Sequence, residues 1–464
     1  MLKSLNSGDL LGWLMLGPHV VHMSGVTKIE TLILGAGLTG LSCAHHLKDP
    51  SRFRIMEREK DVGGLAKTKK RPGGFLCDGT GHWLHLKSPE MKSLVEGLLG
   101  DNLIARTRRA RIYSKGTFTL YPFQANTYGL PKEVIAECLN GLIQAKFVDK
   151  HPEPKNYLDW IRATFGAGIC KHFMEPYNEK IYGVPLDTLA ADFAAKYIPQ
   201  PNMQSVIDGA LGLSKEAMGY NAQFVYPKTG GIGALAQALH KSVERPAEYE
   251  RTPKSINVAT KQVVMNDGEV FEYQHLVNTI PLPDLVELAF RGNAEKVPAH
   301  VLEASKKLRA NSVLYFDVAI KGAPSEHQDY HWIYLPESDF PFYRVGSYSA
   351  VEKSLVPQGY RSYYVEFGHY GALDAKKFEQ PMIDGLKRLG LLSDEDQIEF
   401  MIPNVLSPAY VLFDDNYEAS RRTVLDWCTS VGLITKGRYG LWQYNAMEDA
   451  LREGKEAATQ IMDV

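Results

Sequence analysis

Hydrophobic positions near the start of the chain follow a strand, helix and strand pattern. An apolar run ends at Gly35, small and apolar residues continue at helical spacing to Leu47, and a second short apolar run leads to Glu57. A short apolar run bounded by glycine is typical of a buried strand, whereas three- and four-residue spacing is typical of a helix. The pattern therefore predicts a strand–helix–strand unit over residues 28–58.

Glycines in the first predicted turn indicate a dinucleotide site. Gly35 permits a tight turn after the strand, Gly37 lets a pyrophosphate approach the backbone, and Gly40 lets the new helix pack against the sheet. The N–H groups of the first helical turn, at Leu38 and Thr39, are expected to face the anion. Such a turn on its own also occurs as a purely structural feature.

An acidic residue after the second predicted strand favours the nucleotide. Glu57 lies 22 positions after Gly35 (57 − 35 = 22), where a carboxylate can accept hydrogen bonds from both hydroxyls of an adenosine ribose. The diglycine Gly63-Gly64 follows shortly afterwards. This second glycine loop resembles FAD proteins of the glutathione reductase and amine oxidase type, and the resemblance implies FAD as the cofactor.

Beyond this unit, the pattern predicts a helical insertion and an antiparallel sheet. Apolar residues have helical spacing from Pro131 to about Leu213. Asn266-Asp267-Gly268 between β-branched runs predicts a hairpin turn, and residues 276–280 read as a further buried strand. Strands rich in Tyr, Phe and Val recur at 311–370, which predicts an antiparallel sheet forming one wall of a pocket.

These elements predict an α/β fold with interleaved domains. A Rossmann-type FAD-binding domain is expected to alternate along the chain with a largely helical insertion and an antiparallel-sheet substrate domain. The predicted division is 24–105, 222–300 and 400–464 for the FAD-binding domain, 106–221 for the helical insertion, 301–399 for the sheet domain and 1–23 for an N-terminal extension.

Size, charge and cysteine content narrow the class of protein. The 464 residues carry a formal net charge of −2, which gives no general electrostatic case for binding nucleic acid or an anionic membrane. Five scattered cysteines without C-x-x-C spacing speak against a disulfide framework or a zinc site, and favour a cytoplasmic protein. His82 and His85 have H-x-x-H spacing without a convincing third ligand, so no metal is expected.

The N-terminal residues read as an extension of the fold. The apolar run at 10–16 is short, lacks a strongly basic flank and has no small-residue cleavage site after it, which disfavours a secretory signal. Dinucleotide-binding folds tend to begin almost at their first strand, so Met23 competes with Met1 as the start of translation. No segment approaches the roughly 18 apolar residues of a membrane span.

Several later motifs resemble the UDP-galactopyranose mutases, more the eukaryotic than the common bacterial type. They run in family order from about residue 30 to the C-terminus. The motifs are Val62-Gly-Gly-Leu-Ala66, Gly74-Phe-Leu-Cys-Asp78 with Gly81-His82, Tyr121-Pro-Phe-Gln124, Phe173-Met-Glu-Pro-Tyr-Asn178, Tyr226-Pro-Lys-Thr-Gly230-Gly231, Trp332-Ile-Tyr-Leu-Pro-Glu337, Pro341-Phe-Tyr-Arg344, and Gly437-Arg-Tyr-Gly440 with Tyr444. The flavin loops are shared with amine oxidases, protoporphyrinogen oxidases and carotenoid desaturases.

The resemblance implies an isomerisation without net redox change. In the mutases, N5 of reduced FAD attacks the anomeric carbon of a nucleotide-linked sugar, which interconverts its pyranose and furanose forms. The implied catalytic residues are His82, Arg344, Arg438 and Tyr444. The expected FAD contacts are Gly35, Gly37, Leu38, Thr39, Gly40, Glu57, Arg58, Gly63, Gly64, Leu65, Gly81, His82, Arg438 and Met447. The expected substrate contacts are Tyr121, Phe123, Gln124, Asn178, Lys196, Tyr197, Trp332, Tyr334, Arg344, Tyr410 and Tyr444.

Each of these assignments has a structural alternative. Arg344 could form an ion pair with Glu337 or Asp339, His82 could cap its loop or bond a backbone carbonyl, and the strand residues Trp332 and Tyr334 could belong to the core or the ordinary surface.

The chain also departs from the family at one half of the diphosphate clamp. Tyr197, with Lys196 beside it, stands where the mutases have a second arginine, and a lysine lacks the guanidinium fork. The alternative activity is therefore that of an FAD-dependent oxidoreductase of the amine oxidase, protoporphyrinogen oxidase or desaturase type. A small-molecule substrate is expected in either case, and a reductant such as NAD(P)H and an oligomeric state are both compatible with the sequence.

Overall fold

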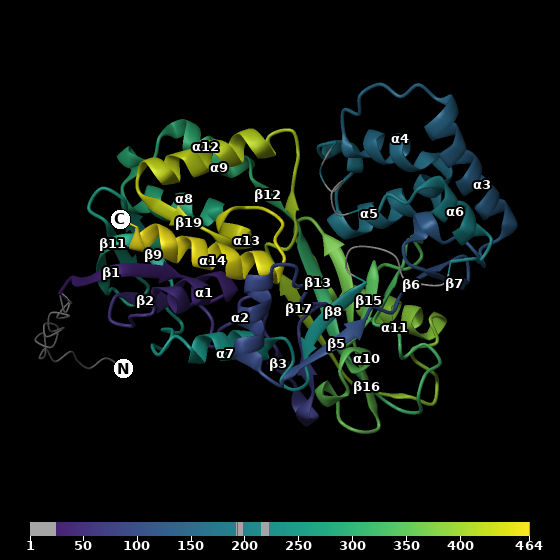
Figure 1. The fold of residues 1–464 in the computed structure, drawn as a ribbon, viewed down its shortest axis with the longest axis horizontal. Helices are drawn as coiled ribbons and strands as arrows, with labels where there is room; N and C mark the ends of the chain where they lie inside the picture. The colour runs from purple at the N-terminus through teal and green to yellow at the C-terminus, as the bar shows by residue number, and fades with distance from the viewer. Residues whose placement is uncertain (1–24, 192, 194–197, 215–221, 464) are drawn as a thin grey trace, which may run out of the picture.

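The computed structural model describes residues 25–191, 193, 198–214 and 222–463 (Figure 1). The first layer is a six-stranded sheet with the order β2-β1-β11-β10-β9, in which β19 also pairs with β11. Pairs of β1 with β2, β1 with β11 and β11 with β19 are parallel. Its strands are β1 (Thr27–Leu34), β2 (Phe53–Met56), β9 (Pro253–Asn257), β10 (Gln262–Met265), β11 (Val270–Asn278) and β19 (Leu433–Thr435).

The predicted strand–helix–strand unit is confirmed as β1, α1 (Leu38–Leu47) and β2. The hairpin turn at 266–268 is confirmed as well, because β10 and β11 pair antiparallel around it. The further strand expected at 276–280 is the end of β11 rather than a separate element. One strand therefore closes the hairpin and enters the parallel sheet beside β1.

Alternation along β1 buries both faces of this sheet. Ile33 belongs to one apolar core, and its neighbours Leu32 and Leu34 belong to another. The first core contains residues of α1, α2, α7 and α14, and the second contains residues of α8, α9 and α12. The bounds are α2 (Pro89–Leu99), α7 (Gly233–Lys241), α8 (Leu282–Gly292), α9 (Ala299–Lys307), α12 (Tyr417–Ser430) and α14 (Met447–Met462).

A second sheet of seven strands lies beside the first layer (Figure 1). Its order is β17-β13-β16-β15-β14-β6-β7, and every neighbouring pair is antiparallel except β14 with β6. Its strands are β6 (Ala110–Ser114), β7 (Thr117–Leu120), β13 (Ser312–Lys321), β14 (Trp332–Tyr334), β15 (Arg344–Ser347), β16 (Tyr360–His369) and β17 (Gln397–Leu406). The sheet thus takes β6 and β7 from the stretch expected to be helical, and β17 extends past residue 399.

Helices from the insertion pack above this sheet, at the upper right of Figure 1. They are α3 (Lys132–Ile143), α4 (Tyr157–Ile169), α5 (Glu175–Tyr182) and α6 (Met203–Ala210). Glycine allows α3 and α4 to approach closely, since a Cβ atom added at Gly168 would lie 2.1 Å from the Glu137 carbonyl oxygen. The helical pattern expected from 131 to 213 is therefore present.

Short elements connect the layers. They are β3 (Lys69–Lys70) with β4 (Leu76–Cys77), β5 (Leu103–Thr107) with β8 (Gln223–Pro227), β12 (Arg309–Ala310) with β18 (Val411–Leu412), α10 (Tyr348–Val351), α11 (Glu379–Arg388) and α13 (Gly437–Gly440).

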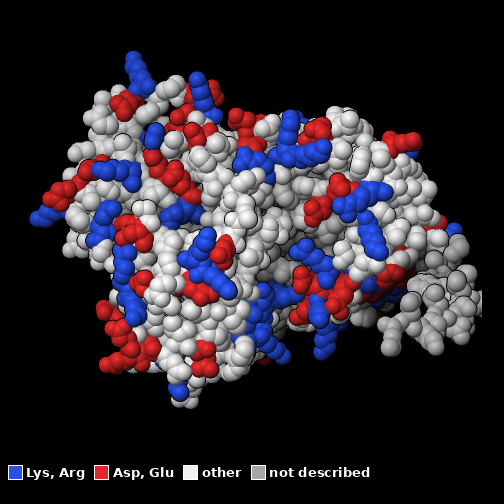
Figure 2. Space-filling model, turned by 180° about the vertical axis from the view of Figure 1, so that it is seen from behind, with Lys and Arg blue, Asp and Glu red and all other residues white. Residues whose placement is uncertain are grey.

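Basic and acidic side chains are interspersed over the face shown in Figure 2, in keeping with the small net charge. Within the described residues, none of the helices combines the length and the apolar character needed to cross a membrane. Lys196, Tyr197 and the expected N-terminal extension lie outside the described residues.

Candidate active site

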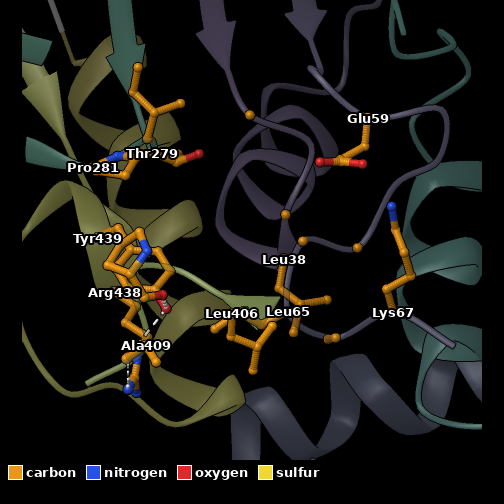
Figure 3. Close-up of a pocket in the computed structure, with 18 of the residues that line it drawn as sticks. Leu38, Glu59, Leu65, Lys67, Thr279, Pro281, Leu406, Ala409, Arg438 and Tyr439 are labelled. Carbon is orange, nitrogen blue, oxygen red and sulfur yellow. Dashed lines mark hydrogen bonds between the residues drawn. The ribbon is translucent and has the colours of Figure 1, made fainter. Parts of the chain in front are cut away.

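A cleft of about 820 Å³ is lined by both sheets and the segments that follow them. Leu38 and Leu65 line it from the β1–α1 side, and Leu406, Ala409 and Arg438 line it from the opposite side (Figure 3). The carboxyl ends of parallel strands are where α/β folds bind nucleotides, and β1, β2 and β11 all end at this cleft.

The glycine turns form an uncapped cradle at the start of α1. Gly37 is the N-cap residue, and no side chain caps the helix. Gly63 donates its N–H to the Ala36 carbonyl at 2.9 Å, which holds the second glycine loop against the first. A Cβ atom added at Gly64 would lie 3.3 Å from the Gly37 Cα atom. The N–H groups of α1 therefore remain available for an anion.

Glu57 is held rigidly at the end of β2. Its carboxylate accepts hydrogen bonds from the N–H groups of Ala36 at 2.8 Å and Glu59 at 2.9 Å, and the residue is only 6% exposed. Glu57 also lines the cleft. A carboxylate has about four lone-pair sites, so two backbone donors leave capacity for ribose hydroxyls.

We expect the Glu57→Ala variant to bind FAD roughly tenfold to a hundredfold more weakly, because hydrogen bonds to a charged group contribute about 1.5–3 kcal/mol. Glu57→Gln retains one acceptor oxygen, so its affinity for FAD should lie between that of Glu57→Ala and that of the wild type. Titration of the apoprotein with FAD, followed by flavin fluorescence, measures the dissociation constants. An unchanged affinity in Glu57→Ala would remove Glu57 from the cofactor site.

Buried Asp78 anchors the loop that carries His82. It accepts hydrogen bonds from the Thr68 hydroxyl at 2.6 Å, from the Ile232 N–H at 3.1 Å and from the Tyr226 hydroxyl. Burial raises the pKa of Asp78 to about 6, against the opposing effect of these hydrogen bonds. The Tyr226–Gly231 motif of the sequence thus acts by holding this loop.

His82 lies at the cleft and bonds its own loop. Its Nδ1 atom is 3.3 Å from the Asp78 carbonyl oxygen and 3.4 Å from the Thr80 hydroxyl. Desolvation lowers the pKa of His82 to about 4, and the positive charges of Arg438 and Arg344 act in the same direction. The backbone bond foreseen as a structural alternative is present, and the imidazole is neutral at neutral pH.

The lowered pKa of His82 predicts a pH-dependent stability. Between about pH 4 and 6.5 the unfolded chain protonates this imidazole and the folded chain does not, so its contribution to stability is lost as the pH falls. Asp78, with its raised pKa, acts in the opposite direction over much of this range. The unfolding free energy of the wild type minus that of His82→Gln should therefore rise by up to about 3 kcal/mol from pH 4 to 6.5. Urea unfolding of both proteins at several pH values measures this difference in unfolding free energy. A difference that does not change with pH would contradict the prediction.

Arg344 and buried Glu366 form a partly buried ion pair on the cleft-facing side of the second sheet. They are cross-strand neighbours on β15 and β16, with Arg344 Nη2 2.8 Å from Glu366 Oε1 and a second contact through Nε. Both side chains line the cleft. Burial opposes the charge on Arg344, but Glu366 raises its pKa above the ordinary value.

The foreseen structural partners of Arg344 are engaged elsewhere. Glu337 pairs with Lys115, and Asp339 pairs with Arg388. An ion pair for Arg344 was expected as an alternative to ligand binding, and the structure has one with Glu366 instead. The Arg344 bonds to Glu366 use Nε and one N–H of Nη2, so among the described residues both N–H groups of Nη1 and the second of Nη2 remain for a ligand.

A stacked pair of tyrosine rings lies beside Arg344. Tyr334 is the cross-strand neighbour of Arg344, and its ring stacks on Tyr121 with a centroid distance of 5.2 Å. The guanidinium of Arg108, a residue absent from the sequence-based site, lies 4.6 Å from the Tyr121 ring centroid. Two arginines therefore flank a stacked tyrosine pair.

Arg438 sits among three tyrosines on the opposite side. Its guanidinium donates to the carbonyls of Asn445 at 3.3 Å and Ala409 at 3.1 Å, the latter drawn in Figure 3. It lies 5.2 Å from the ring centroid of Tyr444, 5.8 Å from that of Tyr439 and 6.0 Å from that of Tyr410. Nε of Arg438 is buried without a partner among the described residues.

Four expected substrate contacts have partners within the protein. Phe123 stacks on Phe173, and the Gln124 side chain donates to the Pro199 carbonyl at 2.7 Å. Asn178 donates to the Met174 carbonyl at 2.6 Å. Trp332 is 6% exposed and packs on Trp83, with 4.1 Å between the two ring centroids. None of the four lines the cleft, and direct substrate contact stays a prediction for them.

Most of the expected cofactor residues come together at the cleft. The expected cofactor contacts that line it are Gly35, Gly37, Leu38, Thr39, Glu57, Arg58, Gly63, Gly64, Leu65, Gly81, His82, Arg438 and Met447, and the expected substrate contacts that line it are Arg344 and Tyr410. The residues that do not line it are Gly40, Tyr121, Phe123, Gln124, Asn178, Trp332, Tyr334 and Tyr444. Lining residues that the sequence reasoning missed include Lys67, Lys69, Thr279, Tyr315, Glu366 and Ala409. Side chains alternate between the two faces of a strand, so the segment Tyr363-Tyr-Val-Glu-Phe shows that Tyr364 and Glu366 share a face. It does not show that Glu366 lies opposite Arg344, because that depends on how β15 pairs with β16.

Comparison with known proteins identifies the family. Residues 38–462 match the flavin-containing amine oxidoreductases. The chain belongs to this family. Its members are flavoenzymes, so FAD is the cofactor and the protein is an enzyme. The uncapped α1 terminus, the facing glycines and the Glu57 carboxylate suit the pyrophosphate and ribose of FAD.

Sequence relatives and similar folds point to different members of the family. Coproporphyrinogen III oxidases of Propionibacterium freudenreichii subsp. freudenreichii and Staphylococcus aureus are 25% and 29% identical over 38% and 34% of this chain. The matches span only 35% and 37% of those relatives.

Among solved structures, reduced UDP-galactopyranose mutase superposes with a TM-score of 0.87 at 24% identity, covering 94% of this chain and 96% of the mutase. A protoporphyrinogen oxidase-like protein of Exiguobacterium sp. 255-15 gives 0.70 at 16% identity, covering 95% of this chain and all of that one. These likenesses concern the fold.

Proposed function

We propose that the enzyme interconverts the pyranose and furanose forms of a nucleotide-linked sugar, in the manner of UDP-galactopyranose mutase. The observation that carries the proposal is the placement of Arg344, a partly buried guanidinium at the FAD cleft with the stacked rings of Tyr334 and Tyr121 beside it. A nucleoside diphosphate needs a cation for the leaving diphosphate and an aromatic surface for the base. The TM-score of 0.87 to the mutase supports the same assignment.

In this proposal, two arginines and one carboxylate bind the diphosphate of the substrate. Nη1 of Arg344 donates to a diphosphate oxygen while Glu366 fixes the orientation of the guanidinium. Arg108, on the far side of the stacked Tyr121–Tyr334 pair, adds positive charge near the same place. In this chain Arg108 could thus compensate for the arginine that Tyr197 replaces.

Neutral His82 and the tyrosines near Arg438 complete the site. When bound and reduced, FAD supplies the nucleophilic nitrogen, and a reductant such as NAD(P)H keeps it reduced. His82 presents an imidazole without charge, so it can orient a hydroxyl or a ring nitrogen without attracting the diphosphate. Tyr410 covers Arg438 and helps to exclude water from the cleft.

A second candidate is an FAD-dependent oxidoreductase acting on a porphyrinogen. The observation in its favour is that two curated sequence relatives are coproporphyrinogen III oxidases. The Arg344–Glu366 pair at the cleft does not separate the two candidates, because coproporphyrinogen III carries carboxylates that a guanidinium binds as well as it binds a diphosphate.

Anaerobic turnover separates the two candidates. The holoprotein is reduced with dithionite and given UDP-galactofuranose, and the products are resolved by ion-exchange chromatography. Conversion to the pyranose with the flavin still reduced supports the mutase. Coproporphyrinogen III is offered to the oxidised holoprotein in parallel. Bleaching of the flavin by the porphyrinogen, with no conversion of UDP-sugars, supports the oxidase.

A further inference from the structure

The hydroxyl of Tyr364 is buried beneath the His82 loop and makes no hydrogen bond within the described part of the chain. Tyr364 lies on β16 and is only 1% exposed. Buried hydroxyls are normally paired, so a solitary one beside an active-site loop calls for an explanation. Neither the diphosphate site nor the FAD cradle uses this group.

Two glycines create the space that Tyr364 occupies. Gly346 is its cross-strand neighbour, and a Cβ atom there would lie 1.8 Å from the Tyr364 Cζ atom. The ring therefore lies flat across Gly346. At its far end, a Cβ atom added at Gly81 would lie 2.5 Å from the hydroxyl oxygen but 3.4 Å from Cζ. The hydroxyl alone forbids a side chain at Gly81.

The remaining anchors of the loop lie at its start. Asp78 is fixed by Thr68, Tyr226 and Ile232. A Cβ atom at Gly79 would lie 3.1 Å from the hydroxyl of Tyr315, which is itself held by Lys69 at 3.0 Å. The loop thus rests on the sheet at two tyrosine hydroxyls, and the Tyr364 hydroxyl supports the end next to His82.

We propose that Tyr364 is a positioning residue whose hydroxyl sets the height of the Gly81–His82 segment above the sheet, and with it the place of the His82 imidazole at the flavin. The phenol ring spans the gap left by Gly346 and acts as a spacer between β16 and the loop. Its unused hydrogen-bonding capacity is available to the backbone of this segment when FAD is bound. The inference holds for either substrate class, because it concerns the cofactor end of the cleft.

The first test removes the hydroxyl alone. Tyr364→Phe should retain FAD but change the absorption maxima of the bound flavin and its midpoint potential, since the polar group next to the flavin has moved. Tyr363→Phe is the matched control, because it removes a hydroxyl from the apolar face of the same strand. Equal flavin spectra and potentials in wild type and Tyr364→Phe would overturn the proposal.

The second test exploits the contact at Gly81. Gly81→Ala should weaken FAD binding roughly tenfold to a hundredfold, because overpacking displaces the loop. In the double variant Gly81→Ala/Tyr364→Phe, the added methyl group meets only ring carbon at an ordinary distance, so most of the lost affinity should return. Gly81→Ala/Tyr363→Phe should show no recovery.

The double variant decides between positioning and a general packing role. FAD dissociation constants are measured by fluorescence, and the thermal midpoint of each holoprotein is recorded beside them. Rescue confined to the Tyr364 pair supports the proposal. Additive losses in Gly81→Ala/Tyr364→Phe, or equal rescue by Tyr363→Phe, contradict it even if all variants fold.

Discussion

Replacement of Arg344 by alanine should abolish measurable binding of UDP while FAD remains bound. The variant loses the only cationic side chain that both lines the cleft and adjoins the Tyr334 ring within the described residues. It also leaves the Glu366 carboxylate buried without its partner, which costs about 3–5 kcal/mol of folding stability. We therefore expect at least a roughly hundredfold rise in the dissociation constant of UDP, together with a lower thermal midpoint.

A double variant separates the two effects. Arg344→Met/Glu366→Gln removes both charges and should recover much of the stability, because a buried pair replaced by neutral groups is often close to neutral in free energy. Binding of UDP should stay lost. Isothermal titration with UDP and urea unfolding provide the two readouts. If the double variant regains UDP affinity, or if Arg344→Ala never loses it, Arg344 is a structural ion-pair residue.

Replacement of Gly40 by alanine should prevent FAD binding. A Cβ atom at this position would lie 2.0 Å from the Gly35 carbonyl oxygen, a backbone atom of the phosphate turn that cannot rotate away. The turn and α1 must separate, which by analogy with overpacked cores costs about 1–3 kcal/mol or more. The protein should be purified without yellow colour and should unfold at a lower temperature.

Gly97→Ala is the matched control for this variant. Gly97 lies in helix α2, and a Cβ atom there would meet no heavy atom within 4 Å. Since alanine is the better helix former, this variant should gain about 0.5–1 kcal/mol of stability and keep its FAD. Full flavin occupancy in Gly40→Ala would mean that the turn adapts, and would contradict the role given to Gly40.

The cofactor half of the site could be predicted from sequence because its signals are local. Gly35, Gly37 and Glu57 lie within one strand–helix–strand unit, so their spacing alone determines where they meet. The hairpin at 266–268 was predictable for the same reason. The junction of that hairpin with the parallel sheet was not, because nothing in residues 270–280 shows that a single strand pairs with β1 as well as with β10.

The substrate half depends on long-range register, which the sequence does not display. Arg344 meets Glu366 rather than Glu337 because β15 pairs with β16, and this pairing decides which carboxylate shares its face. Arg108 comes from a segment assigned to the largely helical insertion, and it lies beside Tyr121, whose ring stacks on Tyr334 of β14. Family motifs indicated which side chains to consider, and only the sheet order shows which of them meet.

The oxidation state of the flavin during turnover distinguishes a mutase from an oxidase. One sample of holoprotein is given UDP-galactofuranose when reduced, again after reoxidation by air, and a third time after renewed reduction, while the flavin spectrum is recorded. For a mutase we expect conversion to the pyranose only in the first and third states, with many turnovers per flavin and no bleaching or reoxidation. Absence of conversion in the reduced states, with the flavin instead reduced stoichiometrically by a porphyrinogen or an amine, would contradict it.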